Sequence, residues 1–164
     1  MNVLFRVFVS FGMVVFGASA SFAQSGWFWQ NPLPQGNHLR AVAVADSQTA
    51  TAVGDYGTIV RTSDGGATWT LMGGTSEDLR GVSFVDANTG TAVGGSRTLP
   101  PFTPAVTATG VGDSILHTTD AGANWRPQFS GTSNFLRGVS YVDVSRCTAV
   151  GNFGTILRTN TGGE

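Results

Sequence analysis

Two short stretches contain residue types that could perform chemistry, and they share one spacing. TSDGGATW (62–69) sets an aspartate among hydroxyl groups and glycines before a tryptophan, and TTDAGANW (118–125) repeats the arrangement. Such a carboxylate could act in acid–base catalysis, bind a metal ion, or accept hydrogen bonds from its own turn. The first two tasks need further carboxylates or ligands close by, and each stretch holds one aspartate. The spacing therefore favours a structural role in the turn.

Three arginines at equivalent positions form the second candidate. Arg40, Arg80 and Arg137 each follow a leucine, in LRAVAVAD, LRGVSFVD and LRGVSYVD. A guanidinium group can donate two parallel hydrogen bonds to a carboxylate, so three repeated arginines could bind an acidic peptide. The alternative is that each arginine bridges neighbouring repeats.

The leucine–arginine strings belong to an internal repeat. They begin at Leu39, Leu79 and Leu136, and TAVG follows at 51, 91 and 148 with the same intervals of 40 and 57 residues. GTIVRT, DSILHT and GTILRT come next, starting at 57, 113 and 154. The longer interval holds an insertion, 95–112, which is rich in Pro and Thr. A long loop of this kind is either functional or disordered.

Each repeat predicts four short β-strands. Large and small residues alternate with a period of two after each leucine–arginine pair, as a strand requires. Four strands in about 40 residues are typical of a β-propeller blade, so the fold class is all-β with four-stranded antiparallel blades. About three blades are predicted: 39–72, 79–129 with its insertion, and an incomplete 136–164. Arg61, His117 and Arg158, on the third strand of each blade, are expected on a solvated face.

Three blades are fewer than the four to eight that close a propeller ring. A Trp-rich segment, GWFWQNP (26–32), resembles a lone outermost strand whose own blade lies elsewhere. Either the chain is a piece of a longer, seven-bladed-like ring, which we favour, or copies of it join to complete a ring.

The N-terminus predicts export. MNVLFR supplies a basic start, VFVSFGMVVFG an apolar run, and ASASFAQ the small residues that a signal peptidase needs, so 1–23 is predicted to be a signal peptide cleaved after Ala23 rather than Ala20. The protein is then secreted or periplasmic and does not insert into the membrane. A net charge of -1 argues against nucleic acid as a partner. The single cysteine, Cys147, can form no internal disulfide.

The spacing T-x-D-x-G-x-[TN]-W resembles the Asp box of BNR-type repeat proteins, which lies on the propeller periphery away from the ligand site. The matching residues are Thr62, Asp64, Gly66, Thr68 and Trp69, then Thr118, Asp120, Gly122, Asn124 and Trp125. The third copy, Thr159, Thr161 and Gly163, lacks the aspartate. The longer pattern, with WxWQNPLPQGNHLRAV, resembles the photosystem II stability/assembly factor-like family of seven-bladed propellers. That resemblance implies a non-catalytic scaffold that binds a protein partner.

Strand topology predicts where a partner would bind. The turns between second and third strands share one face with the connections between blades, opposite the Asp boxes. Arg40, Arg80 and Arg137 would surround the central channel there, because the first strand of a blade is innermost. We expect a protein or peptide partner, such as an acidic or membrane-protein segment, and no cofactor or metal. The predicted contact residues are Arg40, Arg80, Arg137, Tyr56, Phe153 and Phe102.

Two other functions remain open. A sialidase-like glycosidase would also use three arginines to bind a sugar carboxylate, but it needs a tyrosine nucleophile activated by a glutamate and an aspartate acid/base. Beyond the leader the sequence offers Glu77 and Glu164 as its only glutamates, and Tyr141 is expected inside the fold. The third possibility is a structural surface or adhesin repeat array. We predict that the protein is not an enzyme.

Overall fold

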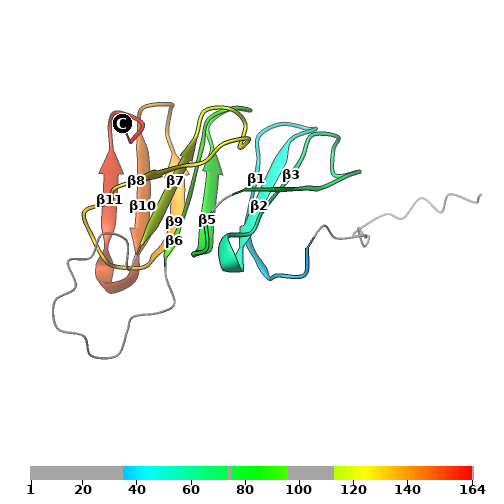
Figure 1. The fold of residues 1–164 in the computed structure, drawn as a ribbon. Helices are drawn as coiled ribbons and strands as arrows, with labels where there is room; N and C mark the ends of the chain where they lie inside the picture. Colours follow the sequence, from blue (N-terminus) through cyan, green and yellow to red (C-terminus); the bar gives the residue numbers. More distant parts are fainter. Residues whose placement is uncertain (1–34, 74, 96–112, 164) are drawn as a thin grey trace, which may run out of the picture.

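The computed structural model describes residues 35–73, 75–95 and 113–163 as three antiparallel β-sheets that stand side by side (Figure 1). The all-β, blade-like fold class predicted from the repeat is confirmed. The predicted signal peptide (1–23), the lone outer strand (26–32), and Phe102 with most of the insertion lie outside the described residues.

The strands follow the repeat. The first sheet contains β1 (Leu39–Val44), β2 (Ala50–Gly54), β3 (Ile59–Thr62) and β4 (Thr70–Met72). The second contains β5 (Asp78–Phe84), β6 (Gly90–Gly95), β7 (Ser114–Thr118) and β8 (Arg126–Gln128). The third contains β9 (Leu136–Tyr141), β10 (Cys147–Gly151) and β11 (Ile156–Thr159). Every strand pairs with the next one along the chain within its sheet.

The hydrophobic core lies between the sheets. One cluster joins Val53 and Ile59 of the first sheet to Leu79 and Val82 of the second. The other cluster includes Val93, Leu136 and Ala149 and joins the second sheet to the third, and β5 lies against both β1 and β9. Because successive strand residues point to opposite faces, each sheet contributes one residue set to each neighbour. Equivalent residues of successive sheets therefore point in the same direction along the stack.

Two sheet faces have no neighbouring sheet among the described residues. On the first sheet Val42 and Val44 are exposed, whereas their counterparts in the second, Val82 and Phe84, are buried or half-buried against the first sheet. On the third sheet Val150 and Ile156 are exposed, although the equivalent Val53 and Ile59 are fully buried. The repeat therefore carries its core pattern to both ends of the described fold.

The glycine that ends each TAVG or CTAVG string is required by a close backbone approach. A Cβ built on Gly54 would lie 1.9 Å from the His38 carbonyl oxygen, and one on Gly94 would lie 1.9 Å from that of Asp78. Both glycines sit where the pairing of the first two strands of the sheet shifts register. The shift brings the connection between sheets over the strand end, where only a glycine fits.

The expectation of a solvated face on the third strand of each blade is wrong for His117. Its side chain is buried between the second and third sheets, with Nδ1 3.2 Å from both the Thr91 hydroxyl and the Tyr141 hydroxyl. The equivalent Arg158, on the third sheet, is exposed. The position faces the next sheet rather than water, so its exposure depends on whether a sheet follows.

Gly94→Ala should destabilise the fold by about 1–3 kcal/mol or more, because the methyl group would overlap the Asp78 carbonyl. Gly73→Ala is the matched control, since a Cβ there meets nothing within 4 Å. Urea unfolding of both variants measures the difference. Equal stability of the two variants would contradict the close approach.

Candidate functional site

The turns gather at two opposite rims of the sheets. At one rim, here called the box rim, the turn after the third strand bonds to the turn after the first strand in every sheet. Gly65 donates its N–H to the Gln48 carbonyl at 2.9 Å, and Ala121 donates to Asn88 at 2.9 Å. At the other rim, a backbone N–H of the turn after the second strand donates a hydrogen bond to the segment that leads into the first strand of the same sheet. Asp55 there bonds to the His38 carbonyl at 2.9 Å.

At the box rim, each aspartate is occupied within its own turn. Asp64 accepts hydrogen bonds from the Thr62 hydroxyl at 2.7 Å, the Thr68 N–H at 2.9 Å and the Thr68 hydroxyl at 2.6 Å. Asp120 accepts the equivalent bonds from Thr118 and Asn124. These donors lower the pKa of each carboxyl from 3.8 to about 2. A carboxylate held this way is a turn brace and a weak base.

The third turn replaces the aspartate with Thr161. Its hydroxyl lies 3.2 Å from that of Thr159, and Gly163 still donates its N–H to the Thr159 hydroxyl at 3.0 Å. The backbone path is therefore kept without the carboxylate.

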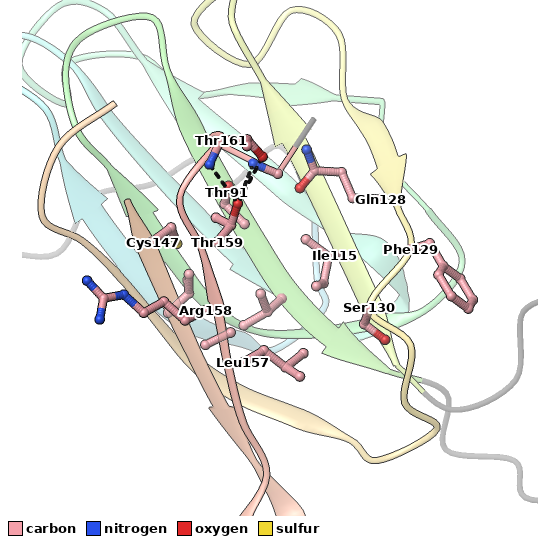
Figure 2. A pocket seen from close by; sticks show the side chains of 15 residues that line it. Thr91, Ile115, Gln128, Phe129, Ser130, Cys147, Leu157, Arg158, Thr159 and Thr161 are labelled. Carbon is pink, nitrogen blue, oxygen red and sulfur yellow. Dashed lines mark hydrogen bonds between the residues drawn. The ribbon is translucent and has the colours of Figure 1, made fainter. Parts of the chain in front are cut away.

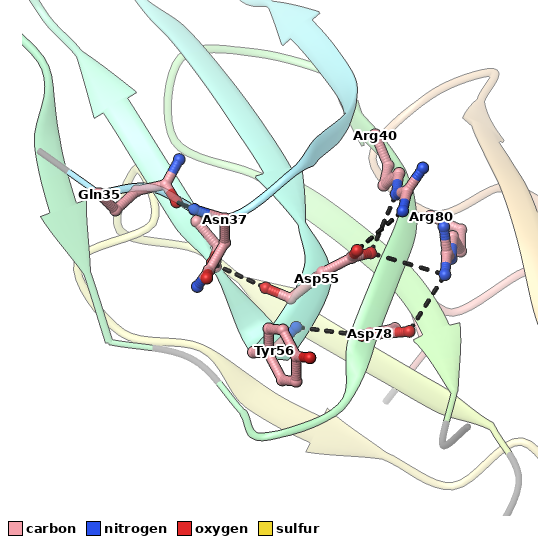
Figure 3. A network of polar contacts seen from close by, with 8 residues as sticks. Gln35, Asn37, Arg40, Asp55, Tyr56, Asp78 and Arg80 are labelled. Atoms are coloured by element: carbon pink, nitrogen blue, oxygen red, sulfur yellow. Dashed lines mark hydrogen bonds and ion pairs between the residues drawn. The ribbon is translucent and has the colours of Figure 1, made fainter. Parts of the chain in front are cut away.

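The opposite rim carries the predicted arginines and is called the arginine rim. Arg40 forms a two-pronged ion pair with the buried Asp55, with Nε 2.9 Å from Oδ1 and Nη2 2.7 Å from Oδ2 (Figure 3). The hydrogen bond to Asp55 raises the pKa of Arg40 above its ordinary value. A buried carboxylate needs such a partner, because burial of an unpaired charge is costly.

Arg80 bridges the first two sheets. Its Nη2 lies 3.0 Å from Oδ2 of Asp78 and 3.5 Å from Oδ1 of Asp55. Asp78 also accepts the backbone N–H of Tyr56 at 3.0 Å, so the carboxylate ties the turn of the first sheet to the start of β5. Figure 3 shows the four charged side chains meeting at this point. Two positive and two negative groups balance there.

Arg137 lies in a different environment. Its Nε donates to the side-chain carbonyl of Asn152 at 2.9 Å, because Asn152 occupies the position that Asp55 holds in the first sheet. Arg137 is exposed, and no salt bridge joins it to a carboxylate within the described ranges. Its guanidinium carbon is 5.1 Å from the centre of the Phe135 ring, whose other neighbour is Arg80 at 5.8 Å. The third sheet thus presents a positive charge beside an aromatic ring.

Two aromatic residues project from the same rim. Tyr56 and Phe153 occupy the centre of η1 (Asp55–Gly57) and of η2 (Asn152–Gly154), with positive φ angles of 56° and 54°. Their side chains are 68% and 90% exposed. Positive φ is strained for a bulky residue, and the strain recurs at the equivalent turn. Both turns hold an aromatic side chain out from the surface.

The structure brings together some of the predicted contact residues and separates others. Arg40, Arg80 and Tyr56 share one polar network, whereas Arg137 and Phe153 belong to the third sheet. Sequence reasoning missed Asp78 and Phe135. Both residues immediately precede the leucine of their strings, at a position whose residue type changes from repeat to repeat, so the repeat gave no signal for them.

No group of three or more His, Cys, Asp or Glu side chains that could hold a metal ion occurs among residues 35–73, 75–95 and 113–163. In the same ranges, no helix is long and apolar enough to cross a membrane. The described surface offers cations, aromatic rings and amide groups, which suit recognition of a carboxylate-bearing or aromatic segment.

Comparison with known proteins gives a likeness of structure. No protein-family model matches the chain, and the search of curated proteins found no match. A solved structure of YCF48 bound to a D1 peptide superposes with a TM-score of 0.63 and 25% identity, over 80% of this chain and 40% of that one. The fold is similar to that of YCF48. YCF48 from Cyanidioschyzon merolae gives a TM-score of 0.61 and 24% identity, over 80% of this chain and 37% of that one.

The chain therefore spans about two fifths of the length of the YCF48 structures it matches. The match supports a partial propeller of the YCF48 kind.

The braced aspartates predict acid sensitivity. Because Asp64 and Asp120 have folded pKa values of about 2, below the ordinary 3.8, they stabilise the fold above pH 4. That contribution is lost as the pH falls from about 4 towards 2. Asp64→Asn/Asp120→Asn should lower the melting temperature at pH 7 and flatten its decline over this range. Melting curves by circular dichroism test this, with Asp113→Asn as control; an unchanged pH profile would contradict the bracing.

Proposed function

We propose that the protein is an exported, non-catalytic propeller module that binds a protein segment through the arginine rim. The chemistry that recognises the partner is a positive charge next to exposed aromatic rings. A peptide segment with a carboxylate near an apolar side chain fits these features.

The observation that carries this proposal is the difference among the three arginines. Arg40 is paired with the buried Asp55 within the first sheet, and Arg80 is paired with Asp78 of its own sheet and with Asp55 of the first, so carboxylates of the fold already neutralise both charges. Arg137 has an amide oxygen as its partner and stays exposed. A carboxylate from outside could therefore pair with Arg137 without displacing a bond that stabilises the fold. The role predicted equally for three arginines falls mainly on this one.

The similar structures support a peptide as the partner. YCF48 has been solved with a bound D1 peptide, and the sequence resemblance drawn from the repeats is to photosystem II assembly factors. The class of ligand proposed for this chain is therefore a peptide segment.

Catalysis has less support. The tyrosine nucleophile of a sialidase-like enzyme would need an activating glutamate, whereas Tyr141 donates to or accepts from the Thr91 hydroxyl at 2.6 Å. Burial raises the pKa of Tyr141 and so makes its phenolate harder to form.

Export is part of the proposal and rests on the predicted signal peptide. If 1–23 is a leader cleaved after Ala23, the mature protein begins at Gln24. N-terminal sequencing of the protein recovered from the envelope or medium of a bacterial host tests this. Retention of Met1, with all of the protein in the cytoplasm, would refute export.

Arg137→Gln should weaken partner binding by about 10- to 100-fold, because a charge-assisted hydrogen bond contributes about 1.5–3 kcal/mol. Arg146→Gln is the matched control, since it removes the same charge from an exposed arginine paired with Asp143 at the box rim. The probes are fluorescently labelled D1 peptide and a scrambled peptide of equal composition, measured by anisotropy at two salt concentrations.

Cross-linking to the native envelope fraction, followed by mass spectrometry, extends the test to partners other than D1. Binding by Arg137 should weaken with salt, because the contact is exposed. If Arg137→Gln and Arg146→Gln retain the same partners with equal affinity, the arginine rim is not the binding site.

A further inference from the structure

Tyr56 stands on the arginine rim at the junction of the first and second sheets. Its side chain is 68% exposed, its φ angle is 56°, and β5 of the second sheet lies against the η1 turn that carries it. Positive φ is strained for a bulky residue, so the turn keeps this shape only where its surroundings hold it. The contacts that hold the turn therefore decide where the Tyr56 ring stands.

The first sheet holds the two ends of this turn. Asp55 donates its N–H to the His38 carbonyl at 2.9 Å, and the Asp55 carbonyl accepts the Thr58 N–H at 3.2 Å and the Thr58 hydroxyl at 2.7 Å. Asn152 and Thr155 form the equivalent contacts in the third sheet. These bonds close the turn, but none of them reaches the N–H of its central residue.

The second sheet holds the centre of the turn. Oδ1 of Asp78 accepts the Tyr56 N–H at 3.0 Å, while Oδ2 accepts Nη2 of Arg80 at 3.0 Å (Figure 3). Asp78 is buried, with 4% of its surface exposed. A Cβ built on Gly57 would lie 1.6 Å from the Thr75 carbonyl oxygen, so the segment that leads into β5 passes directly over the turn. Tyr56 is thus braced by a carboxylate that belongs to the next repeat.

The sequence pairs this carboxylate with the short turn. The residue before the leucine of each repeat is His38, Asp78 or Phe135. Asp78 follows the repeat that contains GDYG, whereas Phe135 follows the repeat in which the insertion 95–112 takes the place of that turn. A role limited to neutralising the arginine two residues later would place an acid before Arg137 as well. The pattern therefore favours a role of Asp78 towards the turn.

We propose that Asp78 is a positioning residue for partner binding, which holds η1 so that the Tyr56 ring contacts an apolar side chain of the bound peptide segment. The inference rests on the proposed function and adds to Arg137 a second contact, at the junction of the first two sheets. Arg80 supports Asp78 through its other oxygen and does not itself bind the peptide. A ring whose backbone is already fixed loses less conformational freedom on binding, so the brace favours affinity.

Fluorine NMR tests the positioning in the unbound protein. The sequence holds two tyrosines, so 3-fluorotyrosine gives two resonances, and Tyr56→Ala identifies them. Tyr141 is the internal reference for the fold, because it bonds to Thr91, which lies near Thr161 at the box rim (Figure 2). Asp78→Ala should shift and broaden the Tyr56 resonance alone. Asp78→Asn should preserve both resonances, since its side-chain carbonyl can still accept the Tyr56 N–H.

Binding tests the contact, with the labelled peptide used for Arg137→Gln. Tyr56→Ala should weaken binding about 10-fold or more, as the loss of an aromatic contact at an interface does. Asp78→Ala should weaken it equally, and the double variant no further, because the carboxylate acts through the ring. Asp78→Asn should restore wild-type binding. Leu71→Ala, which removes an exposed apolar side chain from β4 of the same sheet, is the matched control and should bind as wild type does.

The outcomes separate this inference from the proposed function. If Tyr56→Ala binds as wild type does while Arg137→Gln is weakened, the inference is overturned and the proposed function stands. A Tyr56 resonance that Asp78→Ala leaves unchanged also overturns the inference, as does an Asp78→Asn variant that loses binding as Asp78→Ala does. A wild-type protein that binds no peptide overturns both, since Tyr56 then has no segment to contact.

Discussion

Each sheet of this protein carries apolar residues on both faces, and the free energy of folding comes from covering both. The alternation of side chains along β5 sends Val82 towards the first sheet and leaves Gly81 close to Gly138 of the third. A single four-stranded sheet would expose both of these faces to water, and a pair of sheets would still leave one apolar face of each uncovered. Stability therefore depends on sheets stacking in series, and each added sheet both covers one face and presents another.

This stacking fixes the turns at two rims and separates their tasks. At the box rim, hydroxyl and amide donors surround each aspartate and close the turn on itself, which leaves little for a ligand. At the arginine rim, side chains cross from one sheet to the next, as Arg80 does. Contacts at this rim depend on the identity of residues in two repeats at once. A single substitution at this rim, such as Asn152 in the place of Asp55, therefore changes the charge that the surface presents.

The sequence predicts the strands well because the repeat restates them three times in one register. It also predicts that Asp64 and Asp120 sit in turns, since one carboxylate per turn has donors nearby. The burial of His117 was not predicted, because a strand pattern does not show whether another sheet covers this position. The equivalent Arg158 is exposed, and no described sheet follows it. The ion-pair network escaped for a related reason. Asp78 and Tyr56 belong to different repeats, and only the stacking of the sheets brings the carboxylate to the N–H.

The three arginines show how one repeated residue acquires different roles. Arg40 and Asp55 occupy in the first sheet the places of Arg137 and Asn152 in the third, and the pairing geometry is the same, with Nε 2.9 Å from the acceptor oxygen in each. Asp55 is buried and charged, so it binds its arginine and also attracts Arg80. Asn152 accepts the same hydrogen bond from Arg137, but its amide carries no negative charge to neutralise the guanidinium. One oxygen exchanged for an NH₂ group thus replaces an ion pair within the first sheet by a neutral hydrogen bond in the third, and it leaves the exposed guanidinium of Arg137 beside the Phe135 ring with its charge unpaired among the described residues. The proposed peptide contact rests on this difference.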